Sequence, residues 1–415
     1  MGNLPQRIAI VGGGPAGASL GALLAKKGCR TVIFHSDKRP PLIVGESLIP
    51  AVIPYLQELG IEEEVKAFSV YKPGATVCLA LDEIITAPFT FAYGKLPEYA
   101  YNAPRDLFDQ AVLNAAGRAG AIIIRSTARL EKGDTPETVR LSEETLSLTL
   151  GIFHGQPDLI VDATGRNRVI PKLLGHSAIE GTRNDVALFA HLSQATITDA
   201  GHIHLDRLTK GWSWRIPLQG KVSLGFVISP RHLEQYGPGI ENQYDSYIRD
   251  EPSLKAYTEG ATRVTPVLRY NNYQLISEQM YGPGWILAGD SAGFADPVFS
   301  SGLYLGLKGA FEACAALAKG TPRAMEQYQA ERLRELKLWQ RVIDSWYNGK
   351  LFNFYRAAQK YKNIPLGTRI ERRGRMRLAR ILTGEAASDP WTMRVFEYFM
   401  ALGVAMRDPA DLVIN

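Results

Sequence analysis

The chain of 415 residues is 46% hydrophobic and 21% charged, with a formal net charge of +5, as in an ordinary soluble globular protein. This length suits two or three domains, or one large domain with an inserted layer. Three cysteines at unrelated spacings exclude a disulfide framework and a zinc motif. No apolar run approaches the roughly 18 residues of a membrane helix, and no secretion signal precedes the first apolar segment. We therefore expect a cytoplasmic protein.

The first 35 residues predict a β-α-β unit. Residues 7–12 are almost continuously apolar and indicate a buried strand, and 15–28 have the spacing of a helix that ends at Gly28. Residues 30–35 (RTVIFH) indicate a second strand. Strands that alternate with helices in this way favour a parallel sheet with helices on its faces.

Further along, the pattern indicates a second layer and then helices. Residues 105–121 have helical periodicity, and 121–130 are apolar enough for a strand. Alternating apolar and polar residues at 146–153 (LSLTLGIF) and 221–228 (KVSLGFVI) predict antiparallel strands. From about residue 304 onward the chain is predicted to be mostly helical.

This order of elements predicts an α/β fold with two parts. A Rossmann-like core is expected over residues 1–320, and a mixed β-sheet on the substrate side is expected to be inserted into it at about 70–100 and 180–280. A helical C-terminal segment over residues 321–415 is expected to cover the substrate site.

The first predicted strand runs into a glycine-rich turn that is typical of dinucleotide binding. Gly12, Gly14 and Gly17 have the G-x-G-x-x-G spacing, directly after a strand and at the start of a helix. The first glycine makes the tight turn, the second lets the backbone approach a pyrophosphate, and the third lets the helix pack on the sheet. The start of that helix, including Ala16, is expected to face the diphosphate.

Two later segments strengthen the nucleotide signal. Residues 159–167 (LIVDATGRN) run from an apolar strand into a glycine turn, and 284–297 (GWILAGDSAGFADP) contain another apolar strand that ends at Gly289 and Asp290. A carboxylate at this place can accept a hydrogen bond from a ribityl hydroxyl of a flavin. Together with Arg105 in the stretch YNAPRDLFD, these segments resemble the FAD monooxygenase superfamily of the p-hydroxybenzoate hydroxylase type.

The resemblance implies that these glycines, Arg105 and Asp290 bind FAD. One position differs from the superfamily pattern, in which the second strand ends in an acidic residue that binds the adenosine ribose. Here that strand ends in His35, which leaves Ser36 or Asp37 as the ribose contact.

Four further stretches stand out: VGESLIP at 44–50, YKPGA at 71–75, WSWRIP at 212–217 and FADPVFSSG at 294–302. Together they resemble flavin-dependent halogenases, and most closely the pyrrole and phenol halogenases. In that family reduced flavin and oxygen form a C4a-hydroperoxide, which a halide attacks. The resulting hypohalous acid moves through the protein to a lysine beside the substrate.

The resemblance gives individual residues a role. Lys72 matches the catalytic lysine, and Trp212 and Trp214 match a barrier that keeps the flavin apart from the substrate. The backbone N–H groups of Ser301 and Gly302 match the halide site, which an anion hole at a helix start suits. Without the resemblance, the tryptophans are core residues and the lysine is a turn residue.

Two more positions bear on the substrate. Glu46 in VGESLIP is expected to gate the strap that joins the flavin and halide sites. The tryptophan halogenases carry a glutamate at the position of Phe299, whereas the phenol and pyrrole enzymes also have phenylalanine there. An electron-rich ring of the phenol, pyrrole or indole type is therefore the expected substrate.

The leading prediction is an FAD-dependent halogenase-like monooxygenase that uses oxygen, halide and FADH2, with a flavin reductase or NAD(P)H as the electron source. One alternative is an FAD-dependent aromatic hydroxylase on the same scaffold, acting on a small aromatic or on an aromatic side chain in a peptide or protein. Another is a non-catalytic flavoprotein partner, against which the presence of Lys72, Trp212 and Trp214 argues.

Positive charge gathers near the C-terminus. Residues 368–380 (TRIERRGRMRLAR) contain six arginines and one glutamate, which form either a solvated helix face or a docking patch for an acidic carrier protein or peptide. A nucleic-acid partner is not expected, because no aromatic residues are interleaved with these arginines.

Overall fold

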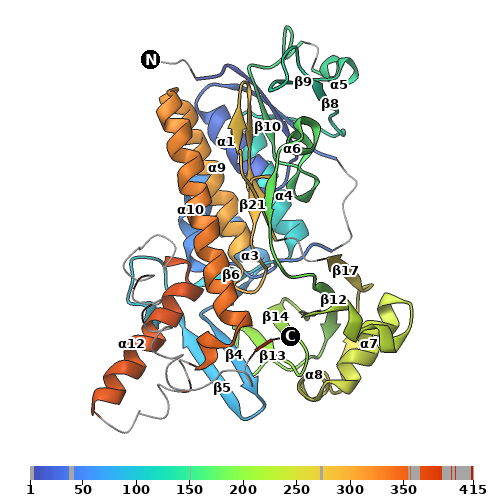
Figure 1. Cartoon of the computed structure of the whole chain (residues 1–415), viewed down its shortest axis with the longest axis vertical. Helices are drawn as coiled ribbons and strands as arrows, with labels where there is room; N and C mark the ends of the chain where they lie inside the picture. Colours follow the sequence, from blue (N-terminus) through green and yellow to red (C-terminus); the bar gives the residue numbers. More distant parts are fainter. Residues whose placement is uncertain are drawn as a thin grey trace.

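The computed structural model describes residues 4–36, 42–149, 151–271, 274–353 and 365–385, together with residues 356, 394, 398, 413 and 414. Its two largest β-sheets lie toward opposite ends of the molecule, and long helices run along one side of the first sheet (Figure 1). The α/β class that the sequence predicts is confirmed.

The first sheet has six strands in the order β19-β20-β10-β1-β2-β7, and all neighbours pair in parallel except β19 and β20. The strands are β1 (Arg7–Val11), β2 (Arg30–Phe34), β7 (Ile122–Ile124), β10 (Leu159–Asp162), β19 (Tyr281–Gly282) and β20 (Trp285–Leu287). Helix α1 (Pro15–Lys26) connects β1 to β2, so the predicted β-α-β unit is confirmed, with the helix ending two residues before Gly28.

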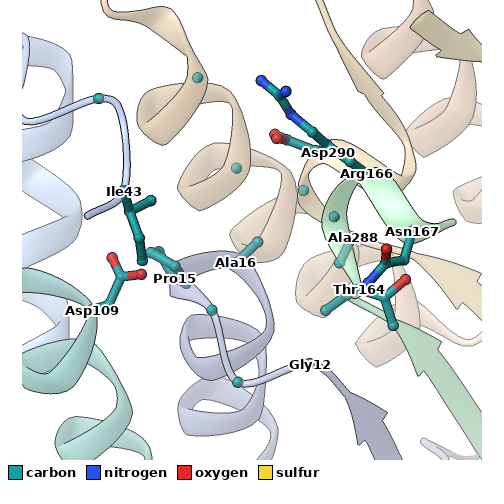
Figure 2. Close-up of a pocket in the computed structure, with 18 of the residues that line it drawn as sticks. Gly12, Pro15, Ala16, Ile43, Asp109, Thr164, Arg166, Asn167, Ala288 and Asp290 are labelled. Atoms are coloured by element: carbon teal, nitrogen blue, oxygen red, sulfur yellow. The ribbon is translucent and has the colours of Figure 1, made fainter. Parts of the chain in front are cut away.

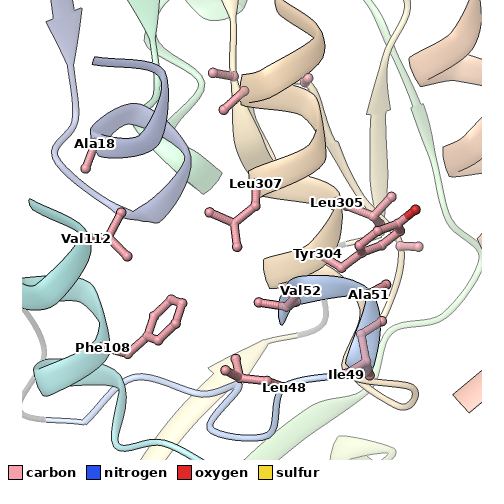
Figure 3. Close-up of a cluster of buried hydrophobic side chains, with 14 of the residues drawn as sticks. Ala18, Leu48, Ile49, Ala51, Val52, Phe108, Val112, Tyr304, Leu305 and Leu307 are labelled. Carbon is pink, nitrogen blue, oxygen red and sulfur yellow. The ribbon is translucent and has the colours of Figure 1, made fainter. Parts of the chain in front are cut away.

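Four helices pack against one another beside this sheet. Helix α1 contacts α4 (Arg105–Arg118) and α9 (Ser301–Lys319), and α9 contacts α10 (Pro322–Tyr347). Figure 3 shows how the segment after β2 enters this layer: Leu48 and Val52 lie between α4 and α9. Both side chains are buried, and burial of such a side chain contributes about 1.5–3 kcal/mol. Apolar packing therefore fixes one side of the VGESLIP segment.

The second sheet has eight strands, in the order β16-β12-β15-β14-β13-β4-β5, with β17 also paired to β12. The strands are β4 (Gly74–Ala80), β5 (Glu83–Pro88), β12 (Val186–Ser193), β13 (Ile203–Arg207), β14 (Trp212–Leu218), β15 (Lys221–Ile228), β16 (Thr262–Arg263) and β17 (Leu268–Asn271). It is a mixed sheet, because β13 and β4 pair in parallel and the other neighbours pair antiparallel. The strand predicted at 221–228 is therefore confirmed.

The two faces of the second sheet belong to different cores. Leu188, Leu224 and Phe226 pack under α7 (Ile240–Asp250) and α8 (Pro252–Tyr257). The opposite face carries Trp212 and Trp214 and joins the main core of the protein. Residues two apart on a strand share a face, so both tryptophans point toward the rest of the molecule.

The strand predicted at 146–153 is wrong. Helix α5 (Glu143–Ser147) occupies the start of this stretch, because Ser142 caps it by accepting a hydrogen bond from the N–H of Thr145 at 3.2 Å. Two glutamates in its first turn favour the helix start further. The strand predicted at 121–130 is also too long, since β7 ends at Ile124.

The remaining elements are short strands, three short helices, the 3-10 helices and the 18-residue helix α12. They are β3 (Val70–Lys72), β6 (Ala100–Asn102), β8 (Leu130–Lys132), β9 (Val139–Leu141), β11 (Ala178–Glu180), β18 (Leu275–Ser277), β21 (Gly293–Phe294), α2 (Ile53–Leu59), α3 (Glu62–Phe68), α6 (Val169–Leu174), α12 (Pro365–Leu382) and the 3-10 helices η1 (Pro50–Val52), η2 (Phe89–Ala92), η3 (Gly165–Asn167), η4 (Pro230–His232), η5 (Glu234–Tyr236) and η6 (Gly289–Ser291). Much of the helical segment predicted at 321–415 lies outside the described residues. Within the described part of the chain, no helix is both long and apolar enough to cross a membrane.

Candidate functional site

A cavity of about 470 Å³ lies where the carboxyl ends of β1, β10 and β20 meet the amino end of α9. Figure 2 shows the turn from Gly12 to Ala16 along one wall, with Thr164 and Asn167 along another. Ligands of open α/β sheets bind at this edge. The cavity is therefore the place where the sequence expects a dinucleotide.

The glycines of the turn have no room for a side chain where the chain packs on itself. A Cβ on Gly12, whose φ is +113°, would lie 2.2 Å from the carbonyl oxygen of Ala163, and one on Gly17 would lie 2.1 Å from the carbonyl oxygen of Gly12. At Gly14 a Cβ would meet nothing within 4 Å. The turn thus presents bare backbone to the cavity, which is what close approach of a diphosphate needs.

Asp162 ties the loops on the far side of the cavity together. Its buried carboxylate accepts hydrogen bonds from the Thr164 hydroxyl at 2.6 Å and from the Ser291 hydroxyl at 3.0 Å. Because Thr164 and Ser291 belong to different cavity loops, one carboxylate fixes the spacing between them. The LIVDATGRN motif therefore acts first as a structural brace.

Arg105 and Asp290 line the cavity from opposite elements. The guanidinium of Arg105 donates to Asp109 at 2.9 Å and to the carbonyl of Val44 at 2.6 Å. Burial raises the pKa of Asp290, and Arg166 and Arg105 act against that shift. Burial is the larger effect, and the two arginines only reduce the shift that it causes.

His35 packs against the glycine turn instead of projecting an acid into the cavity. A Cβ on Gly13 would lie 2.5 Å from Nδ1 of His35, so ring and turn are in close contact. Ser36 also lines the cavity, whereas Asp37, the other expected ribose contact, lies outside the described residues.

Residues 44–50, called the strap here, separate the cavity from Lys72. The ammonium of Lys72, on β3, donates to the Ser47 hydroxyl at 2.8 Å and to the carbonyl of Leu48 at 2.7 Å. Its side chain is 2% exposed and lies 5.3 Å from the ring centre of Phe89. Burial lowers the pKa of Lys72 to about 7. Because Ser47 also lines the cavity, one hydroxyl joins the two sites.

Glu46 faces the opposite direction from Ser47 along the strap. Its carboxylate lies 3.0 Å from Nε2 of His191 on β12, and both side chains are buried. This pair fastens the strap to the tryptophan face of the second sheet. His191 was not predicted, since a single histidine on a strand gives no local signal.

Trp212 and Trp214 are part of a continuous row of aromatic rings. Ring centres of Trp212 and Trp214 are 5.8 Å apart, and Phe189 lies 5.9 Å from Trp214 and 5.8 Å from Tyr270. Tyr270 also lines the cavity. A Cβ on Gly225 would lie 2.2 Å from the Trp214 ring, so this glycine is what lets the ring lie flat on the sheet. The row extends from the cavity along the face of the second sheet that joins the main core.

Ser301 and Gly302 form the first turn of α9. Ser300 precedes them in the left-handed region with φ +56°, and its side chain does not cap the helix. The first N–H groups of a helix lack intrahelical partners and attract anions. Gly302 lines the cavity, while Ser301 is buried and Phe299 packs against Trp346 with ring centres 5.6 Å apart.

The chain is similar to known proteins in sequence and in fold. The family model for tryptophan halogenase matches residues 7–76 and 91–365. Tryptophan 2-halogenase of Chondromyces crocatus is 28% identical over 385 residues, covering 87% of this chain and 72% of that protein. The chlorinase of the 1H-pyrrole-2-carbonyl peptidyl-carrier protein from Pseudomonas fluorescens is 25% identical over 336 residues, covering 73% of each. The structure of halogenase PltM with phloroglucinol and FAD superposes with a TM-score of 0.73 at 16% identity, covering 98% of this chain and 94% of that one, which shows a shared fold.

Proposed function

Because the chain belongs to the tryptophan halogenase family, whose members are FAD-dependent oxidoreductases, we propose that it halogenates an electron-rich aromatic ring. The reaction would take FADH2 from a separate reductase, with oxygen and a halide. The observation that carries this proposal is the placement of Lys72, which is buried beside the strap and bonded to the same serine that lines the cavity.

FAD fits the cavity because its walls supply what the cofactor needs. The bare backbone at Gly12 and Gly14 would hold the diphosphate, and Arg105 and Asp290 would contact the flavin half. When bound, reduced FAD together with oxygen would supply the two-electron oxidation that converts halide into hypohalous acid. The N–H groups of Ser301 and Gly302 would hold the halide at the cavity wall.

Lys72 would receive the oxidised halogen. With its pKa lowered to about 7, a substantial fraction of the side chain is a neutral amine near neutral pH. A neutral amine can attack hypohalous acid, forming an N–halogen bond and releasing water. The protonated form can instead donate a hydrogen bond to hypohalous acid and make its halogen more electrophilic. Either form acts at a position that bulk water does not reach.

The ring that accepts the halogen is expected to be electron-rich. Phe299 supplies no carboxylate to remove the ring proton, so a phenol, pyrrole or indole type of substrate fits better than an unactivated ring. Glu46 is held by His191 and is a strap residue in this proposal, with no direct role in proton transfer.

A carrier-bound or peptide-bound substrate is the finer part of the proposal. On α12, Arg372 and Arg373 are exposed, and the guanidinium of Arg372 lies 5.8 Å from the ring centre of Tyr93, which is itself 60% exposed. Helix α12 also contacts η2, whose Phe89 lies beside Lys72. An acidic carrier docked on these arginines would therefore sit near the lysine side of the strap.

The mass of the product tests the proposal. Purified protein supplied with FADH2, oxygen, bromide and a panel of phenols and pyrroles should give a product with the bromine isotope doublet. A gain of 16 mass units, independent of bromide, would instead identify the hydroxylase alternative. A chain that binds no FAD at saturating concentration would overturn both.

A further inference from the structure

A buried chain of hydrogen bonds runs from the tryptophan pair to the loop before α9. The indole N–H of Trp212 donates to the Tyr347 hydroxyl at 2.9 Å, and that hydroxyl donates to Oδ2 of Asp296 at 3.1 Å. The three side chains are 1%, 5% and 1% exposed. They come from three separate elements: the middle strand β14, the last residue of α10, and the FADPVFSSG loop.

Two further hydrogen bonds hold the Asp296 carboxylate in place. Its Oδ1 accepts the backbone N–H of Val298 at 3.0 Å, and its Oδ2 also accepts the side-chain amide of Gln274 at 3.1 Å. The first of these bonds fixes the turn that leads to Ser301 and Gly302. The carboxylate is thus shared between the loop that precedes α9 and the hydroxyl that holds Trp212.

We propose that Asp296 and Tyr347 are positioning residues that fix the orientation of the Trp212 ring and couple it to the loop leading into α9. The proposal rests on the proposed function and on the barrier role that the family resemblance implies for Trp212. An indole has a single N–H, and a buried donor left without a partner costs about 1–3 kcal/mol. The Trp212 ring therefore strongly prefers one orientation as long as the hydrogen bonds from Trp212 through Tyr347 to Asp296 are intact.

The surroundings of Asp296 make this series of hydrogen bonds depend on whether the Asp296 carboxyl is protonated. Burial raises the pKa of Asp296 to about 6, while hydrogen bonds from Val298, Tyr347 and Gln274 and the charge of Arg183 act against that shift. The Arg183 guanidinium lies 3.8 Å from the ring centre of Tyr347 and is paired with Asp185.

Protonation changes the direction of the hydrogen bonds. An ionised Asp296 only accepts, so Tyr347 donates to it and keeps a lone pair for the indole of Trp212. A protonated Asp296 carries its own donor, which competes with the indole for the Tyr347 oxygen. The Trp212 ring should therefore be held most firmly above pH 6 and loosen below it.

A fluorine label reads this coupling without any turnover. The chain has six tryptophans, so protein labelled with 5-fluorotryptophan and bound to FAD should give a resonance that the variant Trp212→Phe assigns. That resonance should shift with a midpoint near pH 6 in the wild type. In Asp296→Asn and in Tyr347→Phe the pH-dependent shift should disappear, because the titrating group or the relay is gone.

Tyr244→Phe is the matched control. Tyr244 is also buried, and its hydroxyl donates to the carbonyl of Leu224 at 3.0 Å on the other face of the same sheet. Deleting this hydroxyl should leave the Trp212 resonance and its pH dependence unchanged. A Trp212 resonance whose position and pH dependence are the same in Tyr347→Phe as in the wild type would overturn the coupling, whatever the enzyme catalyses.

Product analysis then tests the consequence. At pH 7.5 Tyr347→Phe should raise the ratio of uncoupled or hydroxylated product to halogenated product by roughly fivefold or more, the effect of losing one buried hydrogen bond. Tyr244→Phe should not change this ratio. An unchanged ratio in Tyr347→Phe, with a wild type that halogenates, refutes the positioning role. A wild type that never halogenates refutes the proposed function instead, and the fluorine result still decides the coupling.

Discussion

The cavity beside the glycine turn and the enclosure around Lys72 lie on two sides of the strap. The cavity is open, whereas the enclosure is filled by side chains. The cavity leaves about 470 Å³ open and is lined by the glycine turn together with charged and aromatic side chains such as Arg105, Asp290 and Tyr270. Lys72 is 2% exposed, and its ammonium is already bonded to two strap oxygens. The cofactor side is thus formed in advance, whereas the lysine side holds a group that the fold itself disfavours. A buried amine with a depressed pKa is typical of a functional residue.

Removing the amine of Lys72 should have the largest effect, and this effect should be on halogenation and not on the flavin. Lys72→Ala is expected to bind FAD and to reoxidise the reduced flavin at the wild-type rate, because the cavity is untouched. Halogenated product should fall by about 10²–10⁴, the usual contribution of one positioned catalytic group. Stopped-flow absorbance measures the flavin, and mass spectrometry measures the product.

Two variants sharpen this result. Lys72→Arg should fail as well, since a guanidinium stays protonated and its planar fork does not fit the place of a compact ammonium. Lys66→Ala, on the exposed lysine of α3, is the control and should keep full activity. Near-normal halogenation by Lys72→Ala would leave this residue with a structural role alone.

On the cavity side, FAD binding is expected to be most sensitive to substitution of the glycines in the turn. In Gly17→Ala the new Cβ would lie 2.1 Å from the backbone oxygen of Gly12, which no side-chain movement can relieve. Strain of about 1–3 kcal/mol should weaken FAD binding by roughly 10- to 100-fold, measured by titration of flavin fluorescence. Gly117→Ala, where the nearest atom is 3.5 Å from the new Cβ, should bind FAD normally. Equal affinity in both variants would show that the turn does not contact the cofactor.

The lysine side should instead gain stability when its charge is removed. Folding lowers the pKa of Lys72 from 10.5 to about 7, so the unfolded chain binds the proton more tightly. The penalty is complete below pH 7, shrinks as the pH rises, and is gone above 10.5. Lys72→Met should therefore stabilise the fold by up to about 4 kcal/mol at pH 7 and by little at pH 10.5. Urea unfolding at the two pH values measures this, and a gain that does not change with pH would show that the amine is not desolvated.

The two sides also differ in how far the sequence alone predicted them. The glycine turn was predicted because tight turns and close backbone approach impose spacing on neighbouring residues, as at Gly12 and Gly17. Lys72 was recognised by family resemblance, but its bonds to Ser47 and Leu48 connect residues 24 and 25 positions apart. Contacts at such separations leave no local pattern. The order of strands in the second sheet could not be predicted for the same reason, because it depends on pairing between segments far apart in the sequence.

Two kinds of residue were missed for different reasons. Asp296 lies inside the FADPVFSSG motif, but the role proposed for it depends on Tyr347, which is 51 positions away in the sequence. His191 is a lone histidine in the mainly apolar strand β12, and Tyr347 is one of several aromatic and polar residues at the end of α10, so nothing in the local sequence marks either. The false strand at 146–153 shows the reverse error, since a local cap at Ser142 overrode an alternating pattern.

The smallest expected effect is that of the arginines on α12, a helix that contacts η2 on the Lys72 side of the strap. The combined variant Arg372→Glu, Arg373→Glu and Arg375→Glu should slow turnover of a carrier-bound substrate several-fold at low salt. Surface charges steer an acidic partner over about 10 Å at 0.1 M salt and only about 3 Å at 1 M, so the deficit should vanish at high salt. Flavin reoxidation should be unchanged, because the cavity lies on the other side of the strap.

Position has to be separated from total charge in that experiment. The control Arg231→Glu, Lys319→Glu and Arg323→Glu makes the same change in net charge at exposed residues outside α12. It should leave turnover of the carrier-bound substrate near the wild-type rate, because these residues do not adjoin η2 and Lys72. A free phenol or pyrrole should be halogenated equally by both triple variants, since a small neutral ring needs no docking surface. If the α12 variant slows the free substrate as much as the carrier-bound one, the arginines support the fold of the lysine side and do not recruit a partner.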